Sequence, residues 1–535
     1  MIAEALTLSL ALAPQDLELR GVHIHTGTKD AWPGSLAVGA GRILPPGSEA
    51  PRGAAVLDLG GAHVFPGLQD AHGHLFGLGT AMVEVDLVGT RSFEEVIEKV
   101  AAEAARRPPG QWILGRGWDQ NDWADKAMPH HAELSAETPD HLVWLVRIDG
   151  HAALCNQRAL LAAGITRDTE APSGGEILRD EDGEPTGVLV DRAMALVNLP
   201  DPDLDEVHRR FLAAQRRCLE LGITCVHDAG ESWRRVEDLR ILAKLGKWKL
   251  RTYVMLSADQ EDAIRRGPWR SEDGRIVVRA VKAYADGALG SYGAALLAPY
   301  ADRRGYRGLM TMPRAGIARL AQLCADHGMQ LCVHAIGDAA NRAVLDAFEE
   351  TRFPGVREAA RFRIEHCQVV SPADLPRFAE LSVIPSMQPS HLTSDMPWAP
   401  TRLGPERVRT SYAFRTLFDM GLEVAFGSDF PVESADPRKG IYAAVTTMAE
   451  SGGPAGGYRP DQKLDRERAL RGFTRNAARA MFAEDDLGTI EPGKIADLTV
   501  FDRDILTCPK DEIPRARVLM TIIGGEIAYR AGEAR

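Results

Sequence analysis

Residues 65–75 read FPGLQDAHGHL, and the rest of the chain is best interpreted around this stretch. An apolar run ends at Pro66-Gly67, and two histidines, His72 and His74, follow one residue apart. If the segment is a strand, residues two apart point to the same side, so both imidazoles can bind one metal ion. Two histidines at this spacing are more often one face of a half-buried strand. The metal hypothesis therefore requires further ligands elsewhere in the chain.

The composition is typical of globular proteins and excludes some function classes. A chain of 535 residues predicts one large barrel with appendages, or about two to four domains. The formal net charge of −12 argues against nucleic acid as a partner, because an acidic surface repels phosphates. Seven scattered cysteines without a CxxC motif argue against a disulfide framework and against a cysteine-type zinc site.

The termini and apolar runs bear on where the protein works. No apolar stretch is long enough to cross a membrane, so we expect no transmembrane segment. The N-terminal MIAEALTLSLALAPQ has a short apolar run, but it carries Glu4 where an export signal has basic residues. We therefore predict a cytoplasmic protein. The alternative is a periplasmic one with a shortened signal peptide.

Short strands broken by Gly and Pro occur at both ends of the chain. Residues 1–64 and 483–535 are predicted to form one composite β-sandwich. The first part contains another His-x-His pair, His23 and His25, which we interpret as residues of a strand face. Residues 65–482 form the main domain, with residues 79–200 as a large insertion that covers the site.

The main domain alternates apolar runs with helical stretches. Eight apolar runs occur, and such an α/β pattern predicts parallel strands covered on both faces, as in a (β/α)8 TIM barrel with the insertion after its first strand. In the stretch 371–380, Ser371 is the expected N-cap and Pro372 the first helical residue. The predicted helices include residues 92–107, 315–327, 338–351, 371–380 and 466–482.

Polar residues occur within or just after several of these runs. Because active-site groups of such barrels lie at the carboxyl ends of the strands, we expect them to converge at one face. A buried lone His or Asp costs several kcal/mol unless it is paired or bound to a metal. The candidates are His72, His74, Lys282, His334, His366 and Asp429.

Several motifs in order resemble the amidohydrolase superfamily of metal-dependent hydrolases. They are PGLQDAHGHL, HAIGDAA, RIEHCQ, FGSDFPVES and GTIEPGKIADLTVFD. The segments GRGWDQNDW, VRIDGHAALCN and SGGEILRDEDGEPTGVL resemble the amidohydrolase-3 branch, which includes N-substituted formamide deformylases. The resemblance covers roughly residues 17–530.

This resemblance implies a metal centre of one or two Zn²⁺ ions, other divalent metals being an alternative. His72 and His74 would bind one ion, His334 and His366 a second, and Asp429 would be the final ligand. Lys282 would bridge the two ions as a carbamate formed with carbon dioxide. The alternative is a Lys282 paired with Asp286, which leaves a single metal.

The expected reaction is hydrolysis of a carbon–nitrogen bond of a small amide-type, non-peptide substrate. A metal-bound hydroxide would attack the carbonyl carbon, with Asp429 as general base and then general acid. An ester or lactone, a dipeptide or a deaminase substrate on the same metal site remains an alternative. A barrel that serves only as a non-catalytic scaffold is a further one. A homo-oligomer is compatible with the sequence.

Other residues are weaker candidates. We expect four of them to contact substrate or a lid, namely Trp118, Arg147, His151 and His391. Asp286 and His227 are expected to support the ligands from behind rather than to bind the metal.

Overall fold

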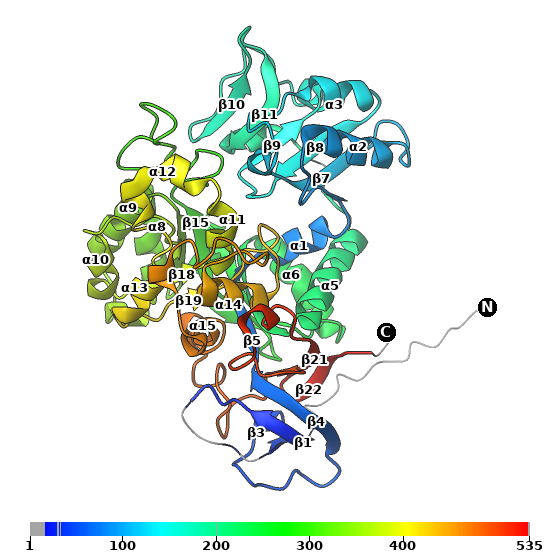
Figure 1. Ribbon diagram of the computed structural model, residues 1–535, viewed down its shortest axis with the longest axis vertical. Helices are drawn as coiled ribbons and strands as arrows, with labels where there is room; N and C mark the ends of the chain where they lie inside the picture. The colour runs from blue at the N-terminus through cyan, green and yellow to red at the C-terminus, as the bar shows by residue number, and fades with distance from the viewer. Residues whose placement is uncertain (1–15, 29–31, 33, 200, 533–535) are drawn as a thin grey trace, which may run out of the picture.

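The computed structural model describes residues 16–28, 32, 34–199 and 201–532. The signal-like residues 1–15 lie outside the described residues. Figure 1 shows a central barrel, with the insertion on one side of it and the small sheet from both chain ends on the opposite side. Within the described ranges, no helix combines the length and the apolar character that a bilayer-spanning segment needs.

The described chain contains the predicted barrel of eight parallel strands. Each strand pairs with the next one along the chain, and every pair is parallel. A short strand, β14 (Trp269–Arg270), attaches antiparallel to β15. The barrel strands are β5 (Leu68–Gly73), β12 (Ile223–Glu231), β13 (Arg251–Ser257), β15 (Ile276–Tyr284), β16 (Gln330–Ala335), β17 (Arg363–His366), β18 (Ile384–Met387) and β19 (Ala425–Phe426).

The barrel closes between its first and last strands through the residues that follow β19. The amide of Asp429 donates to the carbonyl of His72 (2.7 Å), and the amide of His74 donates to the carbonyl of Phe430 (2.9 Å). Closure therefore brings the His-x-His stretch and Asp429 to the same edge.

Helices cover the outside of the barrel. The helix α5 illustrates why they form, because Asp203 caps it by accepting from the Glu206 amide, and Phe211 and Cys218 are buried against the barrel. It ends before Gly222, whose φ of 86° suits glycine. The helices are α5 (Leu204–Glu220), α6 (Trp233–Lys244), α7 (Glu261–Arg265), α8 (Arg314–Asp326), α9 (Asp338–Glu350), α10 (Leu375–Glu380), α11 (Pro389–Asp395), α12 (Ala399–Val408), α13 (Phe414–Asp419), α14 (Pro437–Thr446), α15 (Arg466–Gly472) and α16 (Arg475–Ala480).

Two predicted helices differ from the structure. The helix predicted from Ser371 begins only at Leu375 with Asp374 as its N-cap, and residues 372–374 form a turn. The helix predicted for residues 466–482 is two short helices, α15 and α16, because the chain turns at residues 473–474. Thr474 has φ −134° and ψ −94°, which no helix accommodates.

The two chain ends join in one sheet. The strand β4 lies between β1 and β20, parallel to the former and antiparallel to the latter. The predicted composite sandwich is thus one continuous seven-stranded sheet, order β22-β21-β20-β4-β1-β2-β3, rather than two separately bonded sheets. Its strands are β1 (Leu17–Ile24), β2 (Ser35–Gly39), β3 (Arg42–Ile43), β4 (Ala55–Pro66), β20 (Leu498–Phe501), β21 (Val518–Ile523) and β22 (Glu526–Arg530).

The residues between α1 (Leu75–Ala81) and α5 form a third unit with its own hydrophobic clusters. Its sheet has the order β10-β11-β9-β8-β7-β6. The predicted helix at residues 92–107 is α2, and the Ser92 side chain accepts from the Glu95 amide. The elements are β6 (Val85–Asp86), α2 (Phe93–Ala104), β7 (Trp112–Trp118), α3 (His131–Glu137), β8 (Leu142–Arg147), β9 (Ala152–Cys155), α4 (Gln157–Ala162), β10 (Gly175–Arg179) and β11 (Pro185–Asp191).

Candidate metal centre

A cavity of about 1140 Å³ opens at the carboxyl ends of the barrel strands. Barrel residues line its floor, among them His74, Lys282, His334, His366 and Asp429. The insertion supplies a further part of the wall, from Arg116, residues 149–151, residues 191–192 and residues 194–195. The histidines, the lysine and the aspartate from five different strands therefore share one space.

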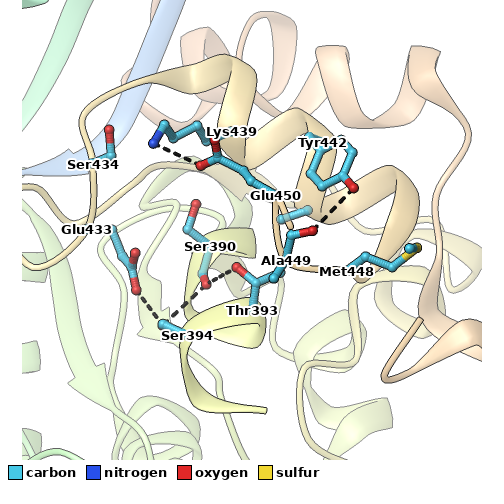
Figure 2. Close-up of a pocket in the computed structure, with 11 residues that line it drawn as sticks. Ser390, Thr393, Ser394, Glu433, Ser434, Lys439, Tyr442, Met448, Ala449 and Glu450 are labelled. Carbon is cyan, nitrogen blue, oxygen red and sulfur yellow. Dashed lines mark hydrogen bonds and ion pairs between the residues drawn. The ribbon is translucent and has the colours of Figure 1, made fainter. Parts of the chain in front are cut away.

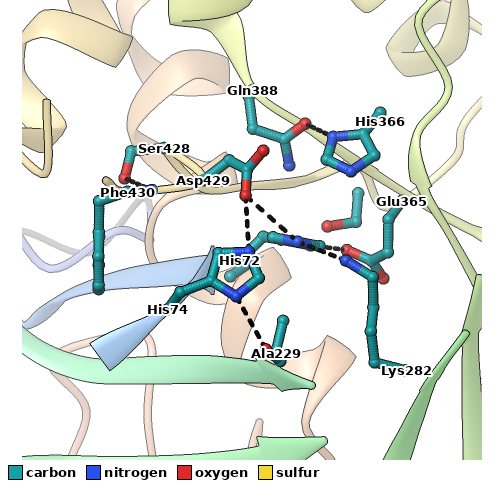
Figure 3. A network of polar contacts seen from close by, with 12 residues as sticks. His72, His74, Ala229, Lys282, Glu365, His366, Gln388, Ser428, Asp429 and Phe430 are labelled. Atoms are coloured by element: carbon teal, nitrogen blue, oxygen red, sulfur yellow. Dashed lines mark hydrogen bonds and ion pairs between the residues drawn. The ribbon is translucent and has the colours of Figure 1, made fainter. Parts of the chain in front are cut away.

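One group of potential ligand atoms joins the first and last strands (Figure 3). The Oδ1 atom of Asp429 lies 3.0 Å from Nε2 of His74 and 3.6 Å from Nε2 of His72. The ligand atoms of this group all lie within 4.8 Å of one another. Metal–ligand bonds of about 2.0–2.1 Å in a tetrahedral site place ligand atoms about 3.3 Å apart, so the group matches Zn²⁺ in size.

The imidazole of His72 is fixed by a carboxylate behind it. Its Nδ1 lies 2.5 Å from Oε2 of Glu365, which can only accept, so the ring proton sits on Nδ1 and Nε2 offers its lone pair. Arg363 in turn holds Glu365 through two hydrogen bonds of 2.7 and 2.9 Å. All three side chains are fully buried. A histidine backed by a carboxylate is the arrangement found at protein metal sites.

His74 and His366 are fixed in the same sense. Nδ1 of His74 donates to the carbonyl of Ala229 (2.9 Å), and Nδ1 of His366 donates to Oε1 of Gln388 (2.8 Å). Each Nε2 is thereby left with a lone pair. For His74 that lone pair faces a carboxylate oxygen of Asp429 at 3.0 Å. Two such atoms repel unless a proton or a metal ion lies between them, so this contact fits a cation.

A second group of potential ligands shares Asp429. It contains His366, His391 and Asp429, with Oδ2 of Asp429 lying 3.7 Å from Nε2 of His391. Within the described residues, Nε2 of His391 has no hydrogen-bond partner although it is buried. The ring of His334 lies 4.5 Å from that of His366, but its Nε2 points toward the carbonyl of Gly287 at 3.4 Å.

Lys282 lies at the centre of this set and is 1% exposed. Its Nζ contacts Nε2 of His72 at 2.9 Å and lies 4.6 Å from the ring centre of Tyr284. Among the described residues, no carboxylate oxygen lies within ion-pair distance of Nζ, and the alternative pairing with Asp286 is not formed. An ammonium buried without a counter-ion carries a desolvation penalty of several kcal/mol.

Two of the ligand candidates lie on strained backbone, one at the end of β17 and one shortly after the last strand, β19. Asp429 has φ 63° and His366 has φ 73°, a left-handed conformation that costs a residue other than glycine on the order of 1–3 kcal/mol. Asp70 helps to hold the strand, since its carboxylate accepts from the amide and hydroxyl of Ser428 and from the His72 amide. The surrounding contacts therefore over-determine the position of Asp429.

Burial sets the protonation states near the metal group. It lowers the pKa of His72 to about 4, and the charge of Lys282 lowers it further, against the opposing effect of Glu365. Burial raises the pKa of Asp70 to about 7, against the hydrogen bonds from Ser428 and His72. His72 is thus a neutral imidazole at neutral pH, the form that binds metals.

The sequence profile of the amidohydrolase family matches residues 55–529, nearly the whole chain. The chain belongs to the amidohydrolase family. The resemblance inferred from the motifs is thereby confirmed, and we describe the protein from here on as a metal-dependent amidohydrolase.

Three known proteins illustrate its relationships. Protein LONG AFTER FAR-RED 3 of Arabidopsis thaliana is 34% identical over 522 residues, which cover 92% of this chain and 88% of the relative. The N-substituted formamide deformylase of Arthrobacter pascens is 27% identical over 548 residues, or 96% and 98% of the two chains. The crystal structure of a metal-dependent hydrolase of Pyrococcus horikoshii OT3 has a TM-score of 0.75 at 29% identity, covering 93% and 99%.

Three of the four residues predicted to contact substrate, Trp118, Arg147 and His391, do not line the cavity of this amidohydrolase. Trp118 is fully buried in the hydrophobic cluster of the insertion, and its indole donates to the carbonyl of Leu145 (2.8 Å). Arg147 is buried and its guanidinium is taken up by Asp119, Asp149 and Gln120. The sequence motifs alone did not reveal that the side chains of Trp118 and Arg147 point into the insertion.

Of the remaining candidates, His151 and Asp286 line the cavity and His227 does not. His151 lines it, donates from Nδ1 to Asp191 (2.6 Å) and lies with its ring 5.0 Å from that of His334. Asp286 accepts from three backbone amides of the strand-end loops, one of them the Ile336 amide. His227 accepts from Arg363 (2.9 Å) deep in the barrel, away from the cavity lining.

Sequence reasoning missed several residues that orient the ligands. Arg363 and Glu365 stand two apart in an apolar run, a charged pair on one strand face that could have been noticed. Asp70 has the same two-residue spacing to His72. Gln388 and Asp191 carry no comparable signal, because only the fold brings them to His366 and His151.

A smaller pocket of about 220 Å³ lies between α11 and α14 (Figure 2). Its charged groups already have partners, since Lys439 contacts Glu450 at 2.8 Å and Glu433 accepts from the Ser394 hydroxyl at 2.5 Å. It contains neither a histidine nor a cysteine. We therefore assign the chemistry of this amidohydrolase to the larger cavity.

Proposed function

We propose that this amidohydrolase cleaves the carbon–nitrogen bond of a small non-peptide amide. The observation that carries the proposal is the shared carboxylate of Asp429, 3.0 and 3.6 Å from two oriented imidazoles at the wall of the large cavity. The relative named N-substituted formamide deformylase, which is matched over almost its full length, supports the amide class.

Zn²⁺, as one ion or two, is the metal we propose for this centre. His72, His74 and Asp429 would hold one ion, and His366 with His391 or His334 would hold the other. Bound there, the metal would supply Lewis acidity that activates a water and polarises the amide carbonyl.

The protein's own groups would perform the proton transfers. We propose that a carboxylate oxygen of Asp429 accepts a proton from the attacking water and then delivers it to the leaving nitrogen. The wall formed by the insertion would orient the substrate, with His151 held by Asp191 so that its Nε2 is free to contact the substrate. His72 stays in place because Glu365 and Arg363 support it.

The first test is the substitution Asp429→Asn. We expect turnover to fall about 10²–10⁴-fold, the range typical of lost general acid–base catalysis, with an unchanged circular dichroism spectrum. The assay uses the zinc-loaded enzyme with N-substituted formamides, N-acyl amines, esters, lactones, dipeptides and deaminase substrates, and the metal content of each sample is measured. The matched control is Glu433→Gln, which faces the small pocket and should retain activity.

Two results would contradict the proposal. Full activity of Asp429→Asn would exclude its proton-transfer role. A higher kcat/KM for esters, dipeptides or deaminase substrates than for any amide would replace the amide class.

We also propose that Lys282 carries a carbamate. Its neutral amine would attack carbon dioxide, forming an N–C bond and releasing one proton, and the anionic product would bridge two cations. The support is a nearly inaccessible amine whose contacts, His72 and Tyr284, bear no negative charge.

The carbamate can be observed directly. Enzyme reconstituted with Zn²⁺ and ¹³C-bicarbonate should give a carbamate carbon signal in its ¹³C NMR spectrum, and Lys282→Gln should lack it. The control Lys249→Gln removes a lysine of the barrel's other side and should keep the signal, because Lys249 is paired with Glu526. A spectrum of the unsubstituted enzyme without this signal would reject the carbamate.

A further inference from the structure

We propose that the small sheet binds a divalent transition-metal ion of its own, through His25, His63 and Asp504. Nε2 of His25 lies 3.0 Å from Nδ1 of His63 and 3.7 Å from Oδ1 of Asp504. All three ligand atoms lie within 4.8 Å of one another. None of these residues lines the large cavity, so the site is separate from the barrel centre.

The topology of the sheet brings the three residues together. His63 lies on β4, the strand between β1 and β20. His25 follows β1 directly, and its amide donates to the carbonyl of Val64 (2.9 Å). On the other side, Phe501 of β20 is the register partner of His63, and Asp504 follows three residues later. Neighbouring strands from both chain ends thus deliver one ligand each.

The side chains are held in place before any ion binds. The ring of His25 stacks on Phe65 with centroids 4.2 Å apart and an interplanar angle of 4°. The ring of His63 stacks on that of His23 at 4.8 Å. The Asp504 carboxylate accepts from the Leu506 amide (2.9 Å) and from the Thr507 hydroxyl (2.8 Å). A preorganised set loses little conformational entropy on binding.

The donor set matches a borderline metal ion. Two imidazole nitrogens and one carboxylate oxygen are ligands that Zn²⁺, Co²⁺ and Ni²⁺ accept, and water can complete the shell. The side chains of His25 and Asp504 remain 20% and 18% exposed, so an ion can reach them. Burial lowers the pKa of both His25 and His63, which favours neutral rings with available lone pairs.

Without an ion, His25 and His63 form a hydrogen bond in which the N–H of one ring donates to the unprotonated nitrogen of the other ring. With an ion, the proton of His25 would sit on Nδ1 and that of His63 on Nε2, so each ring stays neutral and no net proton is released. The bound ion would connect β1, β4 and the loop after β20. It would therefore tie the N-terminal strands to the C-terminal ones.

The experiment counts ions in the full-length enzyme. Protein stripped with a chelator is dialysed against micromolar free Zn²⁺, and the bound zinc is measured by mass spectrometry of the elements. We expect Asp504→Asn and His63→Ala each to bind about one ion fewer than the unsubstituted enzyme and to lose part of its zinc-dependent rise in Tm. Asp504→Asn keeps an oxygen for the Leu506 amide, so the loop should stay folded.

The matched control is His130→Ala, which removes a 43% exposed histidine of the insertion that belongs to none of the ligand groups. It should bind as many ions as the unsubstituted enzyme. His72→Ala removes a ligand of the barrel centre and should leave the ion of the small sheet in place. The double variant His72→Ala with Asp504→Asn should therefore bind fewer zinc ions than His72→Ala alone. Equal zinc content in the unsubstituted enzyme and in a folded Asp504→Asn variant would overturn the proposal.

Discussion

At the scale of single residues, the orientation of each histidine in the barrel centre is set by the group that its Nδ1 contacts. Glu365, the Ala229 carbonyl and Gln388 each accept from a different Nδ1, so three Nε2 atoms are aimed at the same space. Only one of these acceptors carries a charge. Because Glu365 makes His72 a stronger donor and is itself held by Arg363, it should matter most for metal affinity.

We expect Glu365→Gln to weaken Zn²⁺ binding about 10–100-fold, the usual effect of removing a carboxylate behind a metal-bound histidine. The amide can still contact His72, so the loss should reflect the missing charge. Zinc affinity is measured by competition with a chromogenic chelator. Gln388→Glu is the matched comparison, since it adds a carboxylate behind His366 and should not weaken binding. Equal affinity of Glu365→Gln and the unsubstituted enzyme would contradict this account.

The same residues show which parts of the candidate site can be predicted from the sequence. The two-residue period of a strand was enough to pair His72 with His74, and the rule on strand ends was enough to add Asp429. The backing residues were not found, because Glu365 reaches His72 from a strand distant in sequence. His391 was expected to contact substrate or a lid, and its distance of 3.7 Å from Asp429 could not be predicted, since it depends on the direction of α11. Side-chain direction in loops and short helices is set by packing, which a single sequence does not display.

At the scale of elements, the eight barrel strands were predictable because each is a nearly continuous apolar run between helices. Residues 79–200 were predicted as an insertion, but the sheet inside it was not, because this sheet mixes parallel and antiparallel pairs. Its strand β7 illustrates the difficulty. Trp118 was a candidate for substrate contact, yet it packs in the core of the insertion, whereas Arg116, which was not a candidate, lines the cavity. The two residues are two apart, which would place them on one face of a regular strand, but the register of β7 against β8 shifts between them, and the sequence does not show this irregularity.

The position of Arg116 leads to a prediction about substrate charge. Its Nη2 donates to the Ile148 carbonyl (3.0 Å), its buried Nε has no partner, and no described carboxylate lies within ion-pair distance. A guanidinium in this state should bind an anionic group of the substrate. We expect Arg116→Gln to reduce kcat/KM for amides that carry a carboxylate about 10–100-fold, as for a lost charge-assisted hydrogen bond, and to affect neutral amides much less.

The measurement is a paired comparison of kcat/KM on acidic and neutral amides of similar size. Arg319→Gln is the matched control, because Arg319 lines the same cavity but its charge is taken up by Glu261 at 2.8 Å. Arg319→Gln should leave kcat/KM unchanged for both the acidic and the neutral amides. An equal loss of kcat/KM for acidic and neutral amides in Arg116→Gln would show that Arg116 supports the cavity wall and does not bind an anionic group of the substrate.

At the scale of the whole molecule, the small sheet is fastened to the barrel by charged pairs that cross between them. Arg251 at the start of β13 contacts Asp497 at 2.5 and 3.0 Å. Lys249 and Arg275 both contact Glu526 of β22, at 2.6 and 3.0 Å. The contact between the small sheet and the barrel thus depends on carboxylates near the C-terminus and on cations at the amino-terminal ends of the barrel strands. Such contacts should make the docking of the two units dependent on pH.

Glu526 allows this to be tested with a defined sign. Burial opposes its ionisation, but the hydrogen bonds from Lys249 and Arg275 hold the pKa of Glu526 below its usual value of 4.5. A carboxylate whose pKa is lower in the folded state stabilises the fold above its unfolded-state pKa, and the contribution is lost as the pH falls through the folded-state pKa.

We expect Glu526→Gln to lower the free energy of unfolding at neutral pH by about 1–3 kcal/mol. The difference from the unsubstituted enzyme should disappear in acid, as urea denaturation at both pH values would reveal. Asp511→Asn is the control, because its pair with Arg515 is exposed and should contribute little at either pH. A stability difference that persists in acid would mean that Glu526 acts through packing rather than through its charge.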